Sequence, residues 1–110
     1  FQNTRYFIGR VAGRVPVIIP HLGGLNGGFD ALLEAGVWDG ETVYADTALA
    51  STREMERFLK RYGSRKLLFG SDFPFGIPTS ELSKVRSLGL KDEDFENVVR
   101  RNVLRLIGQE

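Results

Sequence analysis

Three short apolar runs, each followed by a polar residue, constrain the fold of this chain more than any other feature. The runs are Val17–Ile19, Val43–Ala45 and Leu67–Phe69. They begin at intervals of roughly 25 residues, which is enough for one strand, one helix and two loops. Because short, almost continuously apolar runs are typical of parallel strands covered on both faces, we predict an α/β chain with parallel strands near 17–20, 43–46 and 67–71.

The polar residues that follow the runs are candidates for a site. His21 follows the first run, Asp46 the second and Asp72 the third. Parallel strands bring their carboxyl ends to one edge of a sheet, and that edge carries the ligand sites of α/β proteins. We therefore expect these three side chains to share an edge.

The three candidates differ in the chemistry that their settings favour. His21 enters the glycine-rich segment HLGGLNGG, and a histidine there can transfer a proton or bind a metal. Asp72 stands between Gly70 and Pro74, where a carboxylate can serve as a metal ligand or as a base. Asp46 is interpreted as a residue that orients a neighbour or caps its loop. A purely structural role for His21 and Asp72 is the alternative.

Composition excludes several classes of protein. The 110 residues make at most one domain, and 15 basic against 14 acidic residues give a net charge of +1, which does not favour a nucleic-acid partner. The chain has no Cys, so disulfides and thiolate metal sites are excluded. No apolar run approaches the roughly 18 residues of a membrane helix, and the start shows no signal-peptide pattern. We therefore expect a cytoplasmic protein with no membrane partner.

The remaining segments predict helices, and three polar residues among them have expected roles. The expected helices cover 2–13, 29–34, 51–62, 80–88 and about 92–107. Ser51 and Glu54 form a capping-box pattern, and an apolar stripe at helical spacing follows it: Met55, Phe58, Leu59 and Tyr62. Asn102 interrupts the apolar side of the last helix, so we expect its amide to bond backbone. Trp38 is expected in the core.

The residues at hand do not complete a catalytic centre. A catalytic zinc site takes three protein ligands and a water, whereas this chain offers one His and no Cys. A serine-nucleophile site is not supported, because no G-x-S-x-G pattern occurs. The sequence therefore predicts half of a site.

With these residues in view, the chain resembles the amidohydrolase-related family of metal-dependent TIM-barrel hydrolases and decarboxylases. The resemblance rests on three motifs, Pro20–Gly24, Val43–Thr47 and Phe69–Phe75, and on the tail Asn97–Ile107. It covers almost the whole chain and corresponds to the last three βα units of a (β/α)₈ barrel plus the closing helices. Residues 1–110 are accordingly expected to be the C-terminal part of an incomplete barrel domain, a fragment whose partner is the remainder of the barrel.

The resemblance also implies roles for individual residues. His21 and Asp72 match the family's catalytic positions, Asp72 also matches a metal ligand, and His21, Gly23 and Gly24 match the substrate-binding segment. The implied cofactor is a divalent metal, zinc first, with manganese or iron as alternatives. The family's His-x-His motif and its strand-five histidine, which supply most of the metal ligands, are absent from this sequence.

The function implied is hydrolysis of a small carboxylated or carbonyl substrate by metal-activated water. The isolated fragment is expected to be inactive, because most ligands are missing. A decarboxylase of the aminocarboxymuconate semialdehyde decarboxylase type is one alternative. Another is a non-catalytic half-barrel that binds a small ligand or forms a homo-oligomer through its open sheet edges. A metal-free family member is a third.

Overall fold

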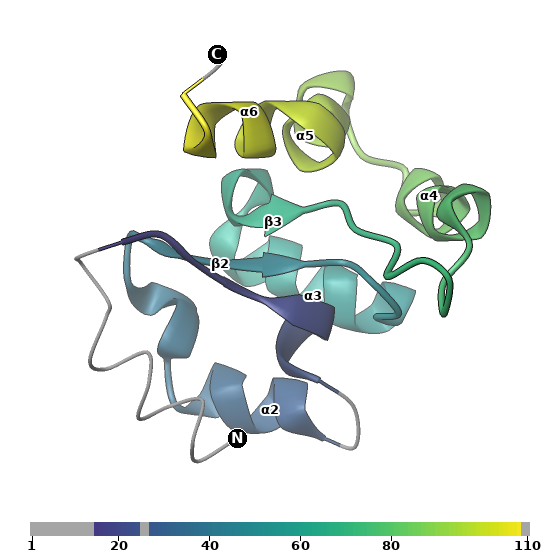
Figure 1. The fold of residues 1–110 in the computed structure, drawn as a ribbon. Coiled ribbons are helices and arrows are strands. Elements are labelled where there is room, and N and C mark those ends of the chain that lie inside the picture. Colours follow the sequence, from purple (N-terminus) through teal and green to yellow (C-terminus); the bar gives the residue numbers. More distant parts are fainter. Residues whose placement is uncertain (1–14, 25–26, 109–110) are drawn as a thin grey trace.

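A computed structural model describes residues 15–24 and 27–108 (Figure 1). The helix expected over 2–13 lies outside the described residues. The strands are β1 (Val17–Ile19), β2 (Val43–Asp46) and β3 (Leu67–Leu68). The α-helices are α2 (Gly28–Glu34), α3 (Thr52–Tyr62), α4 (Pro78–Ser87), α5 (Asp92–Glu96) and α6 (Asn102–Leu106). Single turns of other helix types are η1 (Pro20–Gly23), η2 (Val37–Asp39), η3 (Ser64–Lys66) and η4 (Asn97–Arg101).

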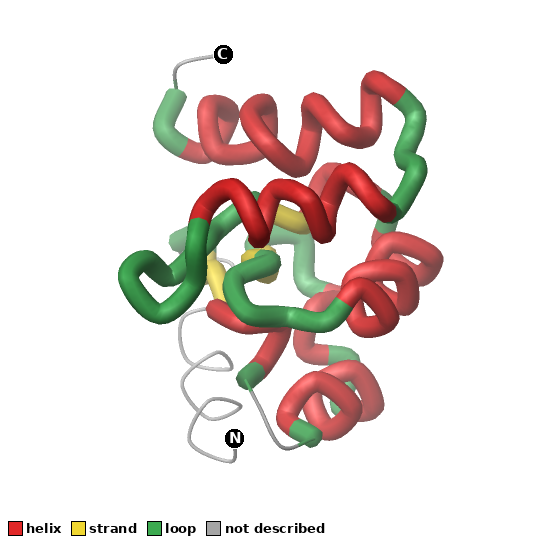
Figure 2. Tube along the Cα trace, turned by 90° about the vertical axis from the view of Figure 1, so that its right-hand side faces the viewer, coloured by secondary structure: helices red, strands yellow, loops and turns green. Residues whose placement is uncertain are grey.

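The three strands form one parallel sheet in the order β1-β2-β3, as the sequence predicted. Val17 pairs with Val43 at one end of the β1–β2 ladder, and Asp46 pairs with Leu68 at the carboxyl end of the sheet. Figure 1 shows α2 below the sheet and α5 and α6 above it, and Figure 2 shows helices around the short strands. Because the strands are parallel, the loops that follow all three of them lie at the same edge of the sheet.

The third strand is shorter than the range 67–71 expected for it. The amide of Phe69 donates to the carbonyl of Val98 (2.9 Å), and the amide of Gly70 donates to Oγ1 of Thr47 (3.2 Å). The Val98 carbonyl lies in η4, a π-helical turn in which the amide of Asn102 bonds Asn97 instead of Val98. Because these partners satisfy the backbone, the chain leaves the ladder directly after Leu68.

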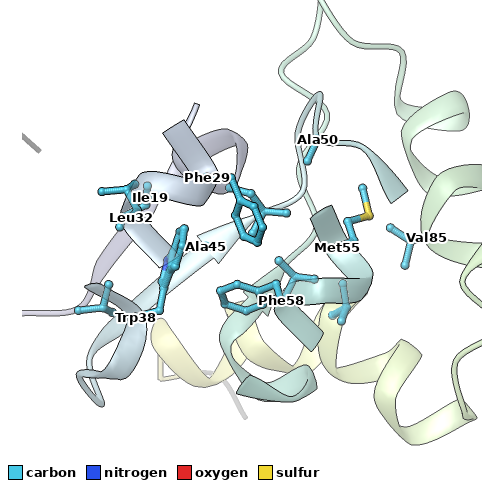
Figure 3. Close-up of a cluster of buried hydrophobic side chains, with 13 residues drawn as sticks. Ile19, Phe29, Leu32, Trp38, Ala45, Ala50, Met55, Phe58 and Val85 are labelled. Atoms are coloured by element: carbon cyan, nitrogen blue, oxygen red, sulfur yellow. The ribbon is translucent and has the colours of Figure 1, made fainter. Parts of the chain in front are cut away.

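The core lies between the sheet and the helices α2 and α3. Phe29, Trp38 and Phe58 are buried, and Figure 3 shows them converging beside Ala45. The Trp38 and Phe58 rings meet edge to face, with centroids 5.3 Å apart. Trp38 is thus a core residue, as expected.

Helix α3 begins and packs as the sequence predicted. Oγ of Ser51 accepts from the amide of Glu54 (3.1 Å), and the Glu54 carboxylate accepts from the amide of Ser51 (3.1 Å), which completes the capping box. Met55 and Phe58 are fully buried, and the other two residues of the stripe pack against them. Burial of this stripe against the sheet positions the loop between β2 and α3.

The cover of the sheet and the start of one helix also differ from the expectation. The sheet is not covered equally on its two faces, because Ile18 is 45% exposed whereas its neighbour Ile19 is buried. Helix α4 begins at Pro78, two residues before the expected start, because proline is favoured in the first turn.

The last helical segment is continuous through α5, η4 and α6. Asn102 is fully buried, and its Nδ2 donates to the carbonyls of Ser64 (2.6 Å) and Leu67 (2.7 Å). This confirms the backbone role expected for the amide. Ile107, which was expected on the packed side, follows the end of α6 and is exposed. No helix among the described residues is both long and apolar enough to span a membrane.

Candidate functional site

The backbone at His21 turns sharply where β1 ends. His21 and Leu22 both have left-handed conformations (φ 57° and 49°), which side-chain-bearing residues adopt at a cost. The amide of His21 donates to Oδ1 of Asp46 (2.9 Å), and Leu22 is fully buried. These two contacts hold the turn, so the backbone that carries the imidazole is fixed at the carboxyl edge of the sheet.

The His21 ring is oriented by a backbone carbonyl. Its Nδ1 lies 2.7 Å from the carbonyl oxygen of Ala48. A carbonyl oxygen only accepts hydrogen bonds, so Nδ1 carries the proton and donates it. In the neutral ring, Nε2 then has a free lone pair.

That lone pair faces Asp72. Nε2 of His21 lies 3.7 Å from Oδ2 of Asp72, and both side chains are partly exposed, at 27% and 41%. Two acceptors at this separation do not bond each other directly, and a cation or a donor group of a ligand can bridge them. The structure therefore brings together the two candidate residues at the carboxyl ends of β1 and β3.

The Asp46 carboxylate stabilises the turn at His21 through backbone hydrogen bonds. Its Oδ1 accepts from the amide of His21 and also from the amide of Ala48 (3.1 Å). It thus holds the residue that carries the imidazole and also the residue whose carbonyl orients it. This geometry agrees with the interpretation of Asp46 as an orienting and loop-capping residue.

The two glycines of the expected substrate segment have different surroundings. A Cβ on Gly23 would lie 2.7 Å from Cδ1 of Leu32, so Gly23 is needed for close packing on α2. Gly24 has a positive φ of 97°, and no atom of residues 15–24 or 27–108 lies within 4 Å of the Cβ position. Of the two glycines, only Gly24 therefore has its Cβ position clear of the described part of the chain.

Asp72 is held in a tight turn. Its φ is 56°, and its carbonyl accepts from the amides of Phe75 (2.8 Å) and Gly76 (3.1 Å). The apolar side chains of Phe73, Phe75 and Ile77 are mostly exposed around this turn. The turn fixes the carboxylate next to an apolar rim.

Replacing Gly76 by alanine is expected to disrupt this turn. A Cβ at Gly76 would lie 1.9 Å from the carbonyl oxygen of Ser71, so the backbone must move. We expect a loss of about 1–3 kcal/mol in the free energy of unfolding, measured by urea denaturation. Gly70→Ala is the matched control, because its Cβ would meet only ordinary contacts at 3.5 Å and beyond. Equal stability losses in the two variants would contradict the packing argument.

The structure also reveals residues that sequence reasoning missed. Glu81 is buried (4% exposed), and its Oε1 accepts from the amide of Leu49, which has a left-handed φ of 59°. Lys84 pairs with Oε2 of Glu81 at 2.6 Å. In the sequence, Glu81 has the ordinary signature of an acidic residue in the first turn of a helix, so no signal there indicated its burial.

Two residues at the opposite, amino end of the sheet have shifted pKa values. Burial, together with a hydrogen bond to Asp39, raises the pKa of Tyr62 to about 12. Burial lowers the pKa of Lys66, whose Nζ donates to the carbonyls of Trp38 and Gly40. These contacts belong to the packing at the amino end of the sheet, whereas His21 and Asp72 lie at its carboxyl end.

The donor atoms satisfy part of a metal site. Within residues 15–24 and 27–108, no three His, Cys, Asp or Glu side chains gather closely enough to hold a metal. His21 and Asp72 offer one nitrogen and one carboxylate, which are common zinc ligands, against the three that a catalytic site requires. Further ligands would have to come from outside these residues.

Comparison with known proteins identifies the class. The sequence matches the family model described as amidohydrolase over residues 6–109, so the chain belongs to the amidohydrolase family. No curated protein matches the chain. It is similar to a solved structure of 2,6-dihydroxybenzoate decarboxylase complexed with 2,6-dihydroxybenzoate, with a TM-score of 0.74 at 16% identity. That similarity covers 97% of this chain and 41% of the other, and it shows that the fold is part of a TIM barrel.

Proposed function

We propose that this chain carries half of the active site of a metal-dependent hydrolase that acts on a small carboxylated or carbonyl substrate. The observation that carries the proposal is the convergence of Nε2 of His21 and Oδ2 of Asp72, 3.7 Å apart at the carboxyl edge. Membership of the amidohydrolase family supports the reaction class. In barrels of this type, catalytic residues come from the ends of several strands.

Each residue has a defined task in this proposal. Nε2 of His21 takes or gives a proton at the substrate, because Nδ1 is committed to Ala48. Asp72 either holds the metal or takes a proton from the attacking water. Gly23 and Gly24 form the substrate-binding segment: Gly23 packs on Leu32 of α2, and Gly24, whose Cβ position no described atom approaches within 4 Å, lets the backbone come close to the substrate. When bound, a divalent metal supplies a lowered pKa for water or a polarised carbonyl.

The remainder of the barrel is the partner that this proposal requires. The described residues lack a three-ligand cluster, and the similar solved chain is more than twice as long as the part that matches. We therefore expect residues 1–110 alone to show no turnover. Chelator-sensitive hydrolysis of an ester, lactone or amide by the isolated chain would contradict this expectation.

Metal analysis of the whole protein tests the proposal. We expect about one zinc, manganese or iron per chain in the parent, and at least a tenfold weaker retention in Asp72→Asn, because removing a ligand or its support typically costs 10–100-fold in affinity. Asp92→Asn is the matched control, since Asp92 is exposed in the first turn of α5. Absence of metal from the parent would favour the metal-free or the non-catalytic alternative.

A decarboxylase is the second candidate, and one observation favours it. The similar solved structure is that of 2,6-dihydroxybenzoate decarboxylase. Release of CO₂ from 2,6-dihydroxybenzoate by the whole protein, without turnover of esters or amides, would support this candidate. His21 and Asp72 have the same placement in either reaction, so the geometry alone favours neither.

A further inference from the structure

One peptide group joins the candidate site to a buried carboxylate. The carbonyl of Ala48 accepts from Nδ1 of His21 (2.7 Å), and the amide of Leu49 donates to Oε1 of Glu81 (2.5 Å). This carbonyl and this amide are the two ends of the same peptide bond. The Ala48–Leu49 peptide therefore lies between an imidazole on one side and a carboxylate on the other.

The peptide needs such a clamp because its backbone is strained. Leu49 has a φ of 59°, a left-handed value that a side chain makes unfavourable. Strained residues persist only where their surroundings determine them. Glu81 satisfies the Leu49 amide, and Nζ of Lys84 donates to the carbonyl of Ala50 (3.2 Å) on the other side of Leu49.

Burying the Glu81 carboxylate is costly unless the charge is paired. Glu81 is 4% exposed, and Lys84, one helical turn later, pairs with its other oxygen at 2.6 Å. A buried carboxylate with a cation and a backbone donor is a fully partnered group. Helix α4 thus supplies a rigid support that reaches the loop between β2 and α3.

We propose that Glu81 is a positioning residue for His21, acting through the Ala48–Leu49 peptide. A carboxylate that accepts from the amide end strengthens the acceptor at the carbonyl end, because linked hydrogen bonds polarise one another. The proton of His21 is then held on Nδ1, and Nε2 is kept free and aimed at Asp72. This is the arrangement by which outer carboxylates orient histidines in metal sites, here with one peptide interposed.

The test is the distribution of the His21 proton between its two ring nitrogens. Ring ¹⁵N chemical shifts of the metal-free whole protein report it, at a pH about two units above the usual histidine pKa of about 6.5. The His21 signals are identified by their loss in His21→Gln. In Glu81→Leu, the Ala48–Leu49 peptide loses the acceptor that holds it, so we expect the Nδ1 bond to Ala48 to be lost and the ratio of Nδ1–H to Nε2–H forms to fall about five- to tenfold, the factor that one typical hydrogen bond is worth.

Three further variants separate positioning from general stability. Glu81→Gln keeps an oxygen acceptor for the Leu49 amide and is expected to preserve most of the ratio. Glu81→Asp keeps the charge, but its shorter side chain does not reach the Leu49 amide, so the ratio of the two His21 forms must fall. If Glu81→Leu does not fold, Glu81→Asp is the variant that tests the proposal. Glu96→Leu is the matched control, because the Glu96 carboxylate pairs with Arg100 (3.0 Å) within the last helical segment.

An unchanged ratio in folded Glu81→Leu, or in Glu81→Asp, would overturn the proposal, and so would an equal fall in Glu96→Leu. The inference rests on the proposed function, because it gives His21 its place in that site. The ring ratio is read without metal or substrate, so a failure here is distinct from a failure of the metal analysis of Asp72→Asn.

Discussion

Replacing Trp38 by alanine is expected to lower the free energy of unfolding by about 3–5 kcal/mol. The side chain is fully buried, and its ring meets the rings of Phe29 (5.7 Å), Phe58 (5.3 Å) and Tyr62 (6.4 Å) between centroids. Its Nε1 also donates to the carbonyl of Tyr44 (3.3 Å). The truncation leaves a cavity where η2, α2 and α3 meet the sheet.

Circular dichroism in urea is the suitable measurement, because Trp38 is the sole tryptophan of this chain and its fluorescence disappears in the variant. Trp38→Phe is the matched control. It keeps an aromatic ring but removes the donor to Tyr44, and its expected loss is about 1–2 kcal/mol, roughly one hydrogen bond and a smaller cavity. A loss below 1 kcal/mol in Trp38→Ala would mean that the aromatic cluster does not stabilise the fold as its geometry indicates.

The second large effect is expected at Asn102. Its buried Nδ2 donates to the carbonyls of Ser64 and Leu67, so alanine would leave two buried acceptors without this partner. Each unsatisfied group costs about 1–3 kcal/mol, and we expect Asn102→Ala to lower the free energy of unfolding by about 3–5 kcal/mol. Urea denaturation of the whole protein measures it.

Asn97→Ala provides a graded comparison in the same helical segment. Its Nδ2 donates once, to Oγ of Ser64 (3.0 Å), a hydroxyl that also bonds Asp94. We expect a loss of about 1 kcal/mol, because one partner remains for the hydroxyl. If Asn97→Ala cost as much as Asn102→Ala, the two backbone contacts of Asn102 would not be the reason for its effect.

The repeating order of strands and helices was predictable because it depends on local patterns. The apolar run at Val43 and the capping box at Ser51 each act within a few residues, and the structure bears them out. Asn102 was predictable for a different reason: a buried amide must find partners, whichever they are.

The parts that sequence reasoning missed depend on contacts between distant segments. The early end of β3 results from the carbonyl of Val98, which the π turn η4 makes available to Phe69. The burial of Glu81 depends on the strained backbone at Leu49. Both pairings join residues that are far apart in the sequence. Neither produces a periodic pattern, so neither could be predicted from the local sequence.

The same reasoning explains how far the candidate site was predictable. Parallel order alone placed His21 and Asp72 at one edge, and the structure puts their side chains 3.7 Å apart. Orientation of the imidazole was not predictable, because it depends on the Ala48 carbonyl, and a backbone carbonyl has no sequence signature.

The support of His21 has a consequence for engineering. The residues that orient it come from β2, the loop after β2 and α4, and the stretch of chain from His21 to Lys84 contains all of them together with the imidazole. A barrel chimaera that exchanged this stretch as a unit would transplant the imidazole together with its orienting contacts. A crossover placed between β2 and α4 would separate the imidazole from Glu81 and demand a new partner for the Leu49 amide.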